Sequence, residues 1–585
     1  MAHIRTYKEV LELEPTEAEQ QLIECAKAGE VCVLNGGQLP SLDQHRECEI
    51  RADILRYILM GGSDECLIES KRIRLEGAFI SGVLNVAYAN TSAFVSLIAC
   101  KFQRSVYLHQ SKFNMLNLSE SNLPGLSAEA IRVAHNLILN EAAVTGKIDI
   151  SSSTIGGQLS LVGAQLQAEE GYALNAHSAQ ISGGIFFHPM TPQAQKEVLK
   201  VFDAKGGINL TAATVGHFYA ESVTVKANSD ANAVGAINLT VNGIARLNNC
   251  EMTGPVDFTG AKITGDLSCK GSTFDTPNSD AFIARRMQVA QSFIWRKDAN
   301  ATGSVILDGA HVAELDDNPS SWPGKDQLSL DGFTYNRITE YTKYDAARRQ
   351  WLRDGSLVGG KFFPQPYTQY AKFLRDTGHD AQARQVLLTR ERMVRYYQRP
   401  EFNPLHRAWR YFWDGLQLVV VGHGHAPFWS LGWLALLIFL ATIPAHHAWE
   451  EGSFAPNSGP IIVSEGWQNL HTTEGNPAKV WSGDAAQTGW SPPETDTTDW
   501  DQDTFDEAWK SVAPGRDWET FNRYAYGADI VIPLINFGQT EAWAPSTTRG
   551  PWGWHLWWLR WVFTVFGWIV TALGAAAITG IIRRD

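Results

Sequence analysis

The chain has 585 residues and a formal net charge of −13, from 49 basic and 62 acidic side chains. Its length exceeds that of one ordinary domain, and its acidic balance argues against a nucleic-acid-binding protein, which needs a basic surface. The charge is uneven, because residues 449–555 hold 16 acidic and 5 basic side chains, a net of −11 that leaves −2 for the rest. All seven cysteines lie before residue 270, whereas 18 of the 21 tryptophans lie after residue 400. The two ends of the chain are therefore suited to different surroundings.

Residues 1–69 are predicted to form a helical cap. The sequence Pro15-Thr16-Glu17 is typical of a helix start, and residues 50–59 place apolar side chains on one helical face. The first 13 residues contain Lys8, Glu9 and Glu12 and no apolar run, so we expect no signal peptide. A cap suits the stacked β-structure predicted next, because open strand edges pair with other chains.

Residues 70–335 repeat a six-residue frame: apolar, any, any, small, any, apolar. Two examples are Leu139/Ala142/Val144 and the frame that begins at Ile150, and successive frames are often 10 or 11 residues apart. Apolar residues five apart do not share a helical face, and glycines recur between the frames. The pattern predicts a β-solenoid, in which short strands turn at small corners and the coils stack to bury a continuous apolar column.

The frame resembles the repeat of pentapeptide-repeat right-handed β-helices. The triplets that end at Ile155, Leu166 and Ile263 stand for the Ala-Asp/Asn-Leu unit of that family. The spacing is near 11 rather than a strict 5, so we expect an irregular helix. The predicted fold class is mainly β: a right-handed pentapeptide-like β-solenoid with a helical N-cap, a helical connector and a two-helix transmembrane module.

Residues 336–425 are predicted to be a helical connector. Helices are expected at 341–352, 366–375 and 381–397, the last two forming an αα-hairpin around Gly378. An aromatic-aliphatic stretch at 404–421 predicts an interfacial helix. Arginines expected at the membrane surface are Arg390, Arg392, Arg395, Arg399, Arg407 and Arg410. They could bind anionic head groups or simply set the topology.

Two transmembrane helices are predicted, at 426–449 and within 556–585. Each uncharged stretch has about the 20 residues that cross a hydrocarbon core, and tryptophans flank both. Arginines precede the first span and end the second, so both termini are predicted to be cytoplasmic and residues 450–555 extracytoplasmic, in a bacterial cytoplasmic membrane. The cysteines then lie in a reducing compartment. Their number is odd and no C-x-x-C pair occurs, which indicates structural thiols.

The whole arrangement resembles a family of bacterial proteins with solenoid repeats and a two-span C-terminal module, often catalogued as "membrane-associated oxidoreductase". The resemblance rests on the sequences around Ile50-Arg51, Asp317 to Trp322, Phe363 to Tyr367, Gly378-His379 and the closing Gly580-Ile-Ile-Arg-Arg. It implies a membrane location and a redox activity. The sequence itself contains no G-x-G-x-x-G at a strand-to-helix turn, no haem C-x-x-C-H and no iron–sulfur cysteine set. We therefore predict no catalytic residue and no cofactor.

The acidic segment contains one weak candidate for cation binding. Asp499, Asp501 and Asp503 are spaced as at the start of a calcium loop. Position six of that loop is Thr504 rather than Gly, and position twelve is Lys510 rather than Glu. The segment is either a solvated acidic loop or a weak cation site.

Residues 521–543 are apolar but too short to span a membrane. One interpretation is a re-entrant helix and loop, since irregular backbone at membrane depth is tolerated only inside protein or against water. Residues at its pore or mouth would then be Asp529, Asn536, Gly538, Gln539 and Glu541. The other interpretation is an amphipathic helix on the outer surface.

The predicted function is a non-enzymatic scaffold or sensor: a cytoplasmic β-solenoid tethered by two spans. The expected partners are the lipid bilayer, a protein on the solenoid face, and further copies of the chain through the spans, where Ala572, Ala576 and Gly580 allow close packing. No nucleic acid is expected. One alternative is an oligomeric two-span cation channel gated by the solenoid. Another is the membrane-associated oxidoreductase that the family label implies.

Overall fold

The computed structural model describes residues 4–68, 72–91, 93–189, 200–339, 346–397, 404–424, 426–468, 507, 509–532 and 534–580. The chain divides into two compact units, Met1–Tyr397 and Gln398–Asp585, which we call the solenoid unit and the helical unit. The boundary falls inside the predicted connector 336–425, so the helices of that connector belong to different units.

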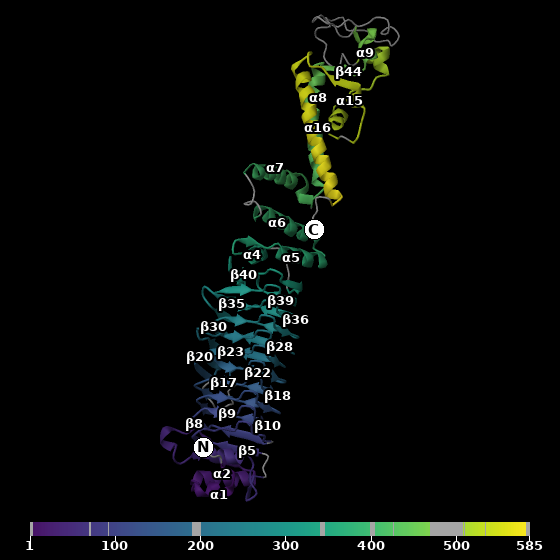
Figure 1. Cartoon of the computed structure of the whole chain (residues 1–585). Coiled ribbons are helices and arrows are strands. Elements are labelled where there is room, and N and C mark those ends of the chain that lie inside the picture. The colour runs from purple at the N-terminus through teal and green to yellow at the C-terminus, as the bar shows by residue number, and fades with distance from the viewer. Residues whose placement is uncertain are drawn as a thin grey trace. The chain divides into compact units, whose positions relative to one another are not determined.

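The solenoid unit is a parallel β-solenoid of about 11 turns. Its short strands stack in one column (Figure 1) and form two large parallel sheets, each made of two ladders. Leu116 pairs with Leu137, and Leu137 with Leu159, so one turn takes 21 or 22 residues. The predicted frame spacing of 10 or 11 residues is therefore half a turn. The β-solenoid prediction is confirmed.

Strands on two sides of the column belong to the first sheet. One ladder contains β5 (Arg72–Glu76), β7 (Phe94–Ile98), β11 (Met115–Asn117), β15 (Leu137–Ile138), β19 (Gln158–Ser160), β22 (Gly184–Phe187), β25 (Phe218–Glu221), β29 (Ala245–Asn248), β33 (Leu267–Ser268), β36 (Gln288–Trp295), β39 (His311–Asp317) and β41 (Thr334–Ile338). The other contains β10 (Lys112–Phe113), β14 (Arg132–Val133), β18 (Thr154–Ile155), β21 (Gln180–Ile181), β24 (Thr214–Val215), β28 (Thr240–Val241) and β32 (Lys262–Ile263), and it continues through the first residues of β36, β39 and β41.

The second sheet forms the remaining two sides. One ladder contains β2 (Glu49–Arg51), β6 (Phe79–Ser81), β8 (Lys101–Phe102), β12 (Asn122–Leu123), β16 (Ala143–Val144), β20 (Gln165–Asn175), β23 (Asp203–Asn209), β26 (Thr224–Lys226), β30 (Glu251–Thr253), β34 (Thr273–Asp275) and β37 (Asn300–Ala301). The other contains β9 (Val106–Tyr107), β13 (Leu126–Ser127), β17 (Ile148–Asp149), β27 (Val234–Gly235), β31 (Val256–Asp257), β35 (Asp280–Ile283), β38 (Ser304–Ile306) and β40 (Leu328–Ser329), and it shares β20 and β23.

The small residue of the repeated frame lies inside a corner of the coil. Glu141 and Ser152 have left-handed backbone, with φ of 56° in both, and the residues after them, Ala142 and Ser153, are fully buried. The Ser153 hydroxyl donates to the carbonyl oxygen of Ala128, in the preceding coil, at 3.2 Å. A larger side chain at this position would collide with that coil, which explains why the frame requires a small residue.

The solenoid begins before the predicted boundary at residue 70. β1 (Val31–Val33) pairs with β5, and β2 pairs with β6, so two strands of the first coil come from the segment predicted to be a helical cap. Three helices also lie in this segment: α1 (Tyr7–Glu12), α2 (Glu17–Ala28) and α3 (Ala52–Leu59). It further contains a short hairpin of β3 (Gly62–Ser63) and β4 (Cys66–Leu67).

A partly buried ion pair joins α2 to β2. Arg51 donates from its backbone N, its Nε and its guanidinium NH2 group to the carboxylate of Glu19, at 2.9, 2.8 and 2.6 Å. The Glu19 side chain is fully buried, and the backbone N of Thr16 also donates to it. Burial alone would raise the pKa of Glu19, but the hydrogen bonds from Arg51 and Thr16 and the Arg51 charge outweigh it and hold the pKa below its usual value.

We expect Glu19→Gln to destabilise the solenoid unit by about 1–3 kcal/mol at neutral pH, because it weakens hydrogen bonds to a buried charged group. The stabilisation that ionised Glu19 gives the folded state is fully present above the pKa that Glu19 has in the unfolded chain. It is lost as the pH falls through the pKa of Glu19 in the folded protein. The difference from the wild type should therefore shrink in acid. This stability difference is measured by thermal unfolding of the full chain, monitored by circular dichroism at several pH values from neutral to acidic. The exposed Glu17→Gln is the control, and a difference independent of pH would contradict the prediction.

Three helices follow the last coil: α4 (Ala346–Gly355), α5 (Gln365–Asp376) and α6 (Asp380–Tyr397). A hairpin of β42 (Leu357–Val358) and β43 (Lys361–Phe362) separates the first two. The packing of α5 against α6 gives the predicted αα-hairpin. Asp317, at the end of β39, accepts hydrogen bonds from Arg348 of α4 at 2.8 and 3.1 Å and from the Trp322 indole at 2.7 Å. This buried pair links the last coil to α4.

The helical unit is built on α7 (Pro404–Val421), α8 (Trp429–Glu450) and α16 (Pro551–Ile578). The bounds of α7 are those predicted for the interfacial helix, and a 3₁₀ turn at Gly422–Gly424 follows it. Short elements fill the segment between α8 and α16: α9 (Gly459–Ile462), α10 (Glu465–Gln468), α13 (Ala513–Arg516), α14 (Arg523–Val531), α15 (Gln539–Ala542), and the pair β44 (Phe454–Pro456) and β45 (Trp543–Pro545). An aromatic cluster around Phe454, Tyr526 and Trp543 packs them together.

Candidate functional site in the helical unit

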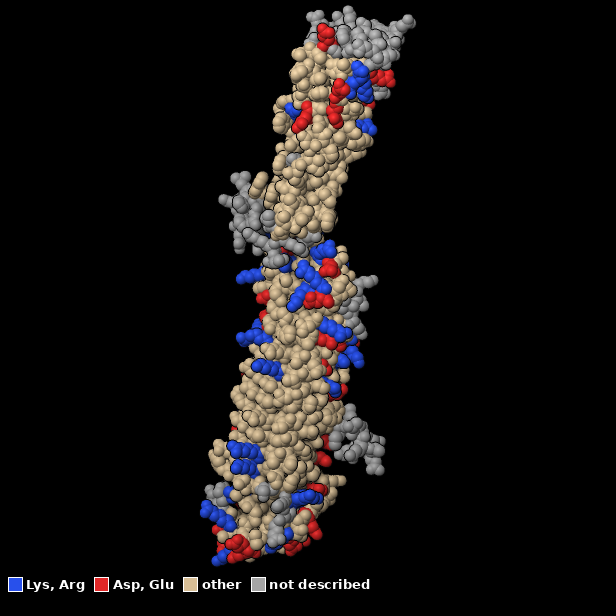
Figure 2. All heavy atoms as spheres, turned by 90° about the vertical axis from the view of Figure 1, so that its right-hand side faces the viewer, with Lys and Arg blue, Asp and Glu red and all other residues tan. Residues whose placement is uncertain are grey.

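α8 and α16 are long and apolar enough to cross a membrane. Their outward side chains are apolar and exposed, as in Phe439 of α8 (59% exposed) and Val565 of α16 (56%). On the face of the helical unit drawn in Figure 2, charged side chains gather toward one end and are missing from a long stretch. An uncharged surface of this kind suits lipid rather than water.

Residues 521–543 do not form one helix. They form α14 and the short helix α15, joined by a loop, and α14 packs on both α8 and α16. A Cβ atom on Gly527 of α14 would lie 2.9 Å from the carbonyl oxygen of Ile438, and one on Gly567 of α16 would lie 1.8 Å from that of Val531. The Thr564 hydroxyl donates to the carbonyl oxygen of Ile530 at 3.1 Å. The two glycines therefore let α14 approach both long helices at backbone distance.

The five residues predicted for a pore or mouth lie together in this hairpin. The Asp529 carboxylate accepts from the backbone N–H of Phe537, of Gln539 at 2.7 Å and of Thr540 at 3.1 Å. Asn536 accepts from the backbone N of Gly538 at 2.7 Å and donates to Glu541 at 2.6 Å.

Gln539 is buried, and its side chain holds the start of α14. Its Oε1 accepts from the backbone N of Asn522 at 2.8 Å, and its Nε2 donates to Glu519 and to the carbonyl oxygen of Thr520. Both carboxylate oxygens of Asp529 are likewise engaged by backbone N–H groups. The arrangement therefore fixes the shape of the loop and leaves the exposed Glu541 as its outward carboxylate.

No family model, curated protein or solved structure matches this chain. The site must therefore be interpreted from its own geometry.

The other predicted sites are only partly described. Asp499, Asp501 and Asp503 lie outside the described residues, as does Arg399. Arg407 and Arg410 lie in α7, but their side chains are also outside the described part of the chain. In α6, Arg390 donates to Glu391 at 2.8 Å, Arg395 lies 4.0 Å from the same carboxylate, and Arg392 is exposed.

The cysteines are free thiols, and all but Cys25 are buried. Burial raises the pKa of Cys32, Cys100 and Cys250 to about 12, so these thiols stay protonated at neutral pH and are weak nucleophiles. Within the described part of the chain, no group of three or more His, Cys, Asp or Glu side chains is arranged to hold a metal ion.

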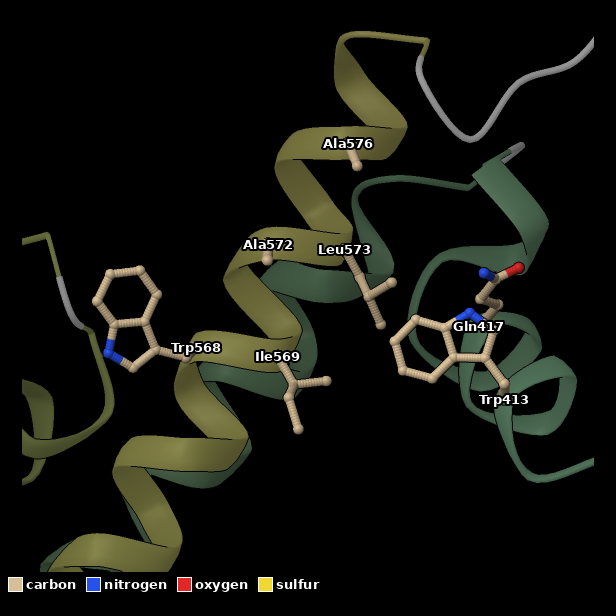
Figure 3. A pocket seen from close by; sticks show the side chains of 7 residues that line it. All are labelled: Trp413, Gln417, Trp568, Ile569, Ala572, Leu573 and Ala576. Carbon is tan, nitrogen blue, oxygen red and sulfur yellow. The ribbon is translucent and has the colours of Figure 1, made fainter. Parts of the chain in front are cut away.

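An apolar groove of about 480 Å³ runs between α7 and α16. Trp413 and Gln417 line it from α7, and Figure 3 shows them opposite Leu573 of α16. Ala572 and Ala576, predicted to allow close helix packing, line the same groove. The small residues that the hairpin uses, Gly527 and Gly567, were not predicted, because a single glycine in an apolar stretch gives no signal of the partner it faces.

Proposed function

We propose that the protein is a membrane-tethered β-solenoid scaffold, with the helical unit in a bacterial cytoplasmic membrane and the solenoid unit in the cytoplasm. The observation that carries this proposal is the apolar outward surface of α8 and α16 over a length that can cross a bilayer. The solenoid core is filled by its own stacked side chains, so a protein partner would bind the outer faces of the column.

The charge distribution supports the proposed orientation. The segment between the two spans carries the net −11, whereas arginines precede the first span and follow the second. Positive charge is retained on the cytoplasmic side during insertion, so both termini would be cytoplasmic.

We expect Leu436→Arg combined with Val565→Arg to move the protein out of the membrane fraction. Leu436 and Val565 face outward from α8 and α16, and an arginine at the centre of a span costs about 2.5–3.5 kcal/mol. The measurement is the share of full-length protein that stays with membranes after an alkaline carbonate wash. Leu42→Arg, at an exposed apolar position of the solenoid unit (78% exposed), is the control. Release of the wild type by carbonate would refute the tether.

The position of α14 favours a second candidate, an oligomeric cation channel. The carbonyl end of α14, at Val531, lies against Gly567 near the middle of α16, and the negative end of a helix dipole favours a cation. One copy has two spans and cannot enclose a pore, so a channel requires an oligomer. A purified protein that is monomeric and shows no ion flux in liposomes supports the scaffold. An oligomer whose flux falls on Glu541→Gln supports the channel.

A further inference from the structure

The loop between α14 and α15 carries an uncovered apolar tip. Leu534 is 76% exposed, and Ile535 and Phe537 are each 49% exposed. Three large apolar side chains facing outward on one short loop are unfavourable in water.

The tip follows the end of α14 that lies deepest along the two long helices. Ile438, which faces Gly527, lies 12 residues before the end of α8 at Glu450, or about 18 Å along the helix axis. Gly567, which faces Val531, lies 16 residues after the start of α16 at Pro551, or about 24 Å. A hydrocarbon core is about 30 Å thick. If the long helices span it, the end of α14 lies well inside it.

Side chains of the hairpin satisfy several backbone N–H groups in and after the loop without water. Asp529 accepts the N–H of Phe537 in the loop and those of Gln539 and Thr540 at the start of α15, and Asn536 accepts that of Gly538. In water such groups would be solvated at no cost, but within a bilayer each unsatisfied one costs several kcal/mol. A carboxylate and an amide used in this way, beside exposed apolar side chains, are what a loop inside hydrocarbon requires.

We propose that this tip, Leu534, Ile535 and Phe537, inserts among the phospholipid acyl chains of the bilayer. The inference rests on the proposed membrane tether. The inserted tip is a third contact with the membrane, beside the two spans, and it does not cross the bilayer. Asp529 acts as a positioning residue, because it holds the loop in the shape that turns the tip outward.

Three variants of the full chain, each with one added cysteine, test the proposal. Each is made in a Cys25→Ser background, because the other six native cysteines are buried. Leu534→Cys reports on the tip, Val565→Cys on the lipid face of α16, and Thr548→Cys on an exposed position before α16. Each is labelled with a polarity-sensitive fluorophore and reconstituted into phosphatidylcholine–phosphatidylglycerol vesicles. Quenching by doxyl-labelled lipid and by aqueous iodide is then compared.

The label at 534 should behave like the label at 565, quenched by doxyl lipid and protected from iodide, and the label at 548 should show the reverse. Adding Asp529→Ala should make the 534 label accessible to iodide. A 534 label quenched by iodide as strongly as the 548 label would refute the insertion. A 534 label protected from both quenchers, with disulfide-linked dimers of the unlabelled variant, would mean that a second copy covers the tip. If iodide also quenches the 565 label, the membrane tether itself fails.

Discussion

Arg348→Ala is expected to lower the free energy of unfolding of the solenoid unit by about 3–5 kcal/mol, the usual cost of removing one partner from a buried ion pair. The Asp317 side chain is fully buried and that of Arg348 is 6% exposed. Without the guanidinium, Asp317 would keep only the Trp322 indole as a described donor. The arginine also stacks on Trp351, with its Cζ 4.6 Å from the ring centre. The substitution therefore leaves a buried carboxylate without its counter-charge.

Arg337→Ala is the matched control for this prediction. Arg337 of β41 pairs with Glu314 of β39, the strand that also carries Asp317, at 3.5 Å, but its side chain is 74% exposed. An exposed pair of this kind contributes about 0–1 kcal/mol. Chemical denaturation of the full-length protein, with hydrogen exchange of α4 as a local readout, compares the two variants. If Arg348→Ala and Arg337→Ala lower the free energy of unfolding by the same amount, the buried pair does not hold α4 on the last coil.

The second large effect is expected from Gly567→Ala in α16. A Cβ atom there would lie 1.8 Å from the carbonyl oxygen of Val531, so α14 must move. Overpacking of this kind costs about 1–3 kcal/mol, although alanine stabilises an ordinary helix relative to glycine by about 1 kcal/mol. We therefore expect Gly567→Ala to destabilise the protein, whereas helix propensity alone would predict stabilisation.

Gly432→Ala in α8 is the corresponding control, because a Cβ atom there would meet nothing within 4 Å. We expect Gly432→Ala to raise or preserve the melting temperature of the detergent-solubilised protein and Gly567→Ala to lower it. Gly567→Ala should also increase hydrogen exchange in α14. If both variants melt alike, the close approach of α14 to α16 is not formed in solution.

The sequence predicts the solenoid well because its signal is local and repeated. Each frame needs an apolar residue for the column and a small one for the corner, and Leu139, Ala142 and Val144 are all buried as expected. The first coil was missed because β1 and β2 are three residues long and carry no periodic pattern. Their pairing with β5 and β6 depends on contacts between residues 30 to 43 positions apart.

In the candidate site, too, the local features could be predicted from the sequence and the long-range contacts could not. The residue types between 521 and 543 indicate an unusual apolar hairpin, and its polar residues do lie together. The sequence left open whether the segment is re-entrant or lies on a surface. Its packing against Ile438 and Gly567 is set by backbone approach between distant segments, which no local pattern reports.

The repeat of the column, the two apolar helices and the acidic segment between them can be predicted from the chain alone, because they follow from residue type and short-range spacing. The pairing of buried charges, the start of the first coil and the packing of α14 on both long helices become known from the folded structure. Those features depend on the fit of surfaces that meet after folding. The identity of a glycine or a carboxylate in the sequence does not reveal which distant residue it contacts. Of the net charge of −13, −11 belongs to one segment and follows from residue types alone, whereas the role of Asp529 depends on its three backbone partners.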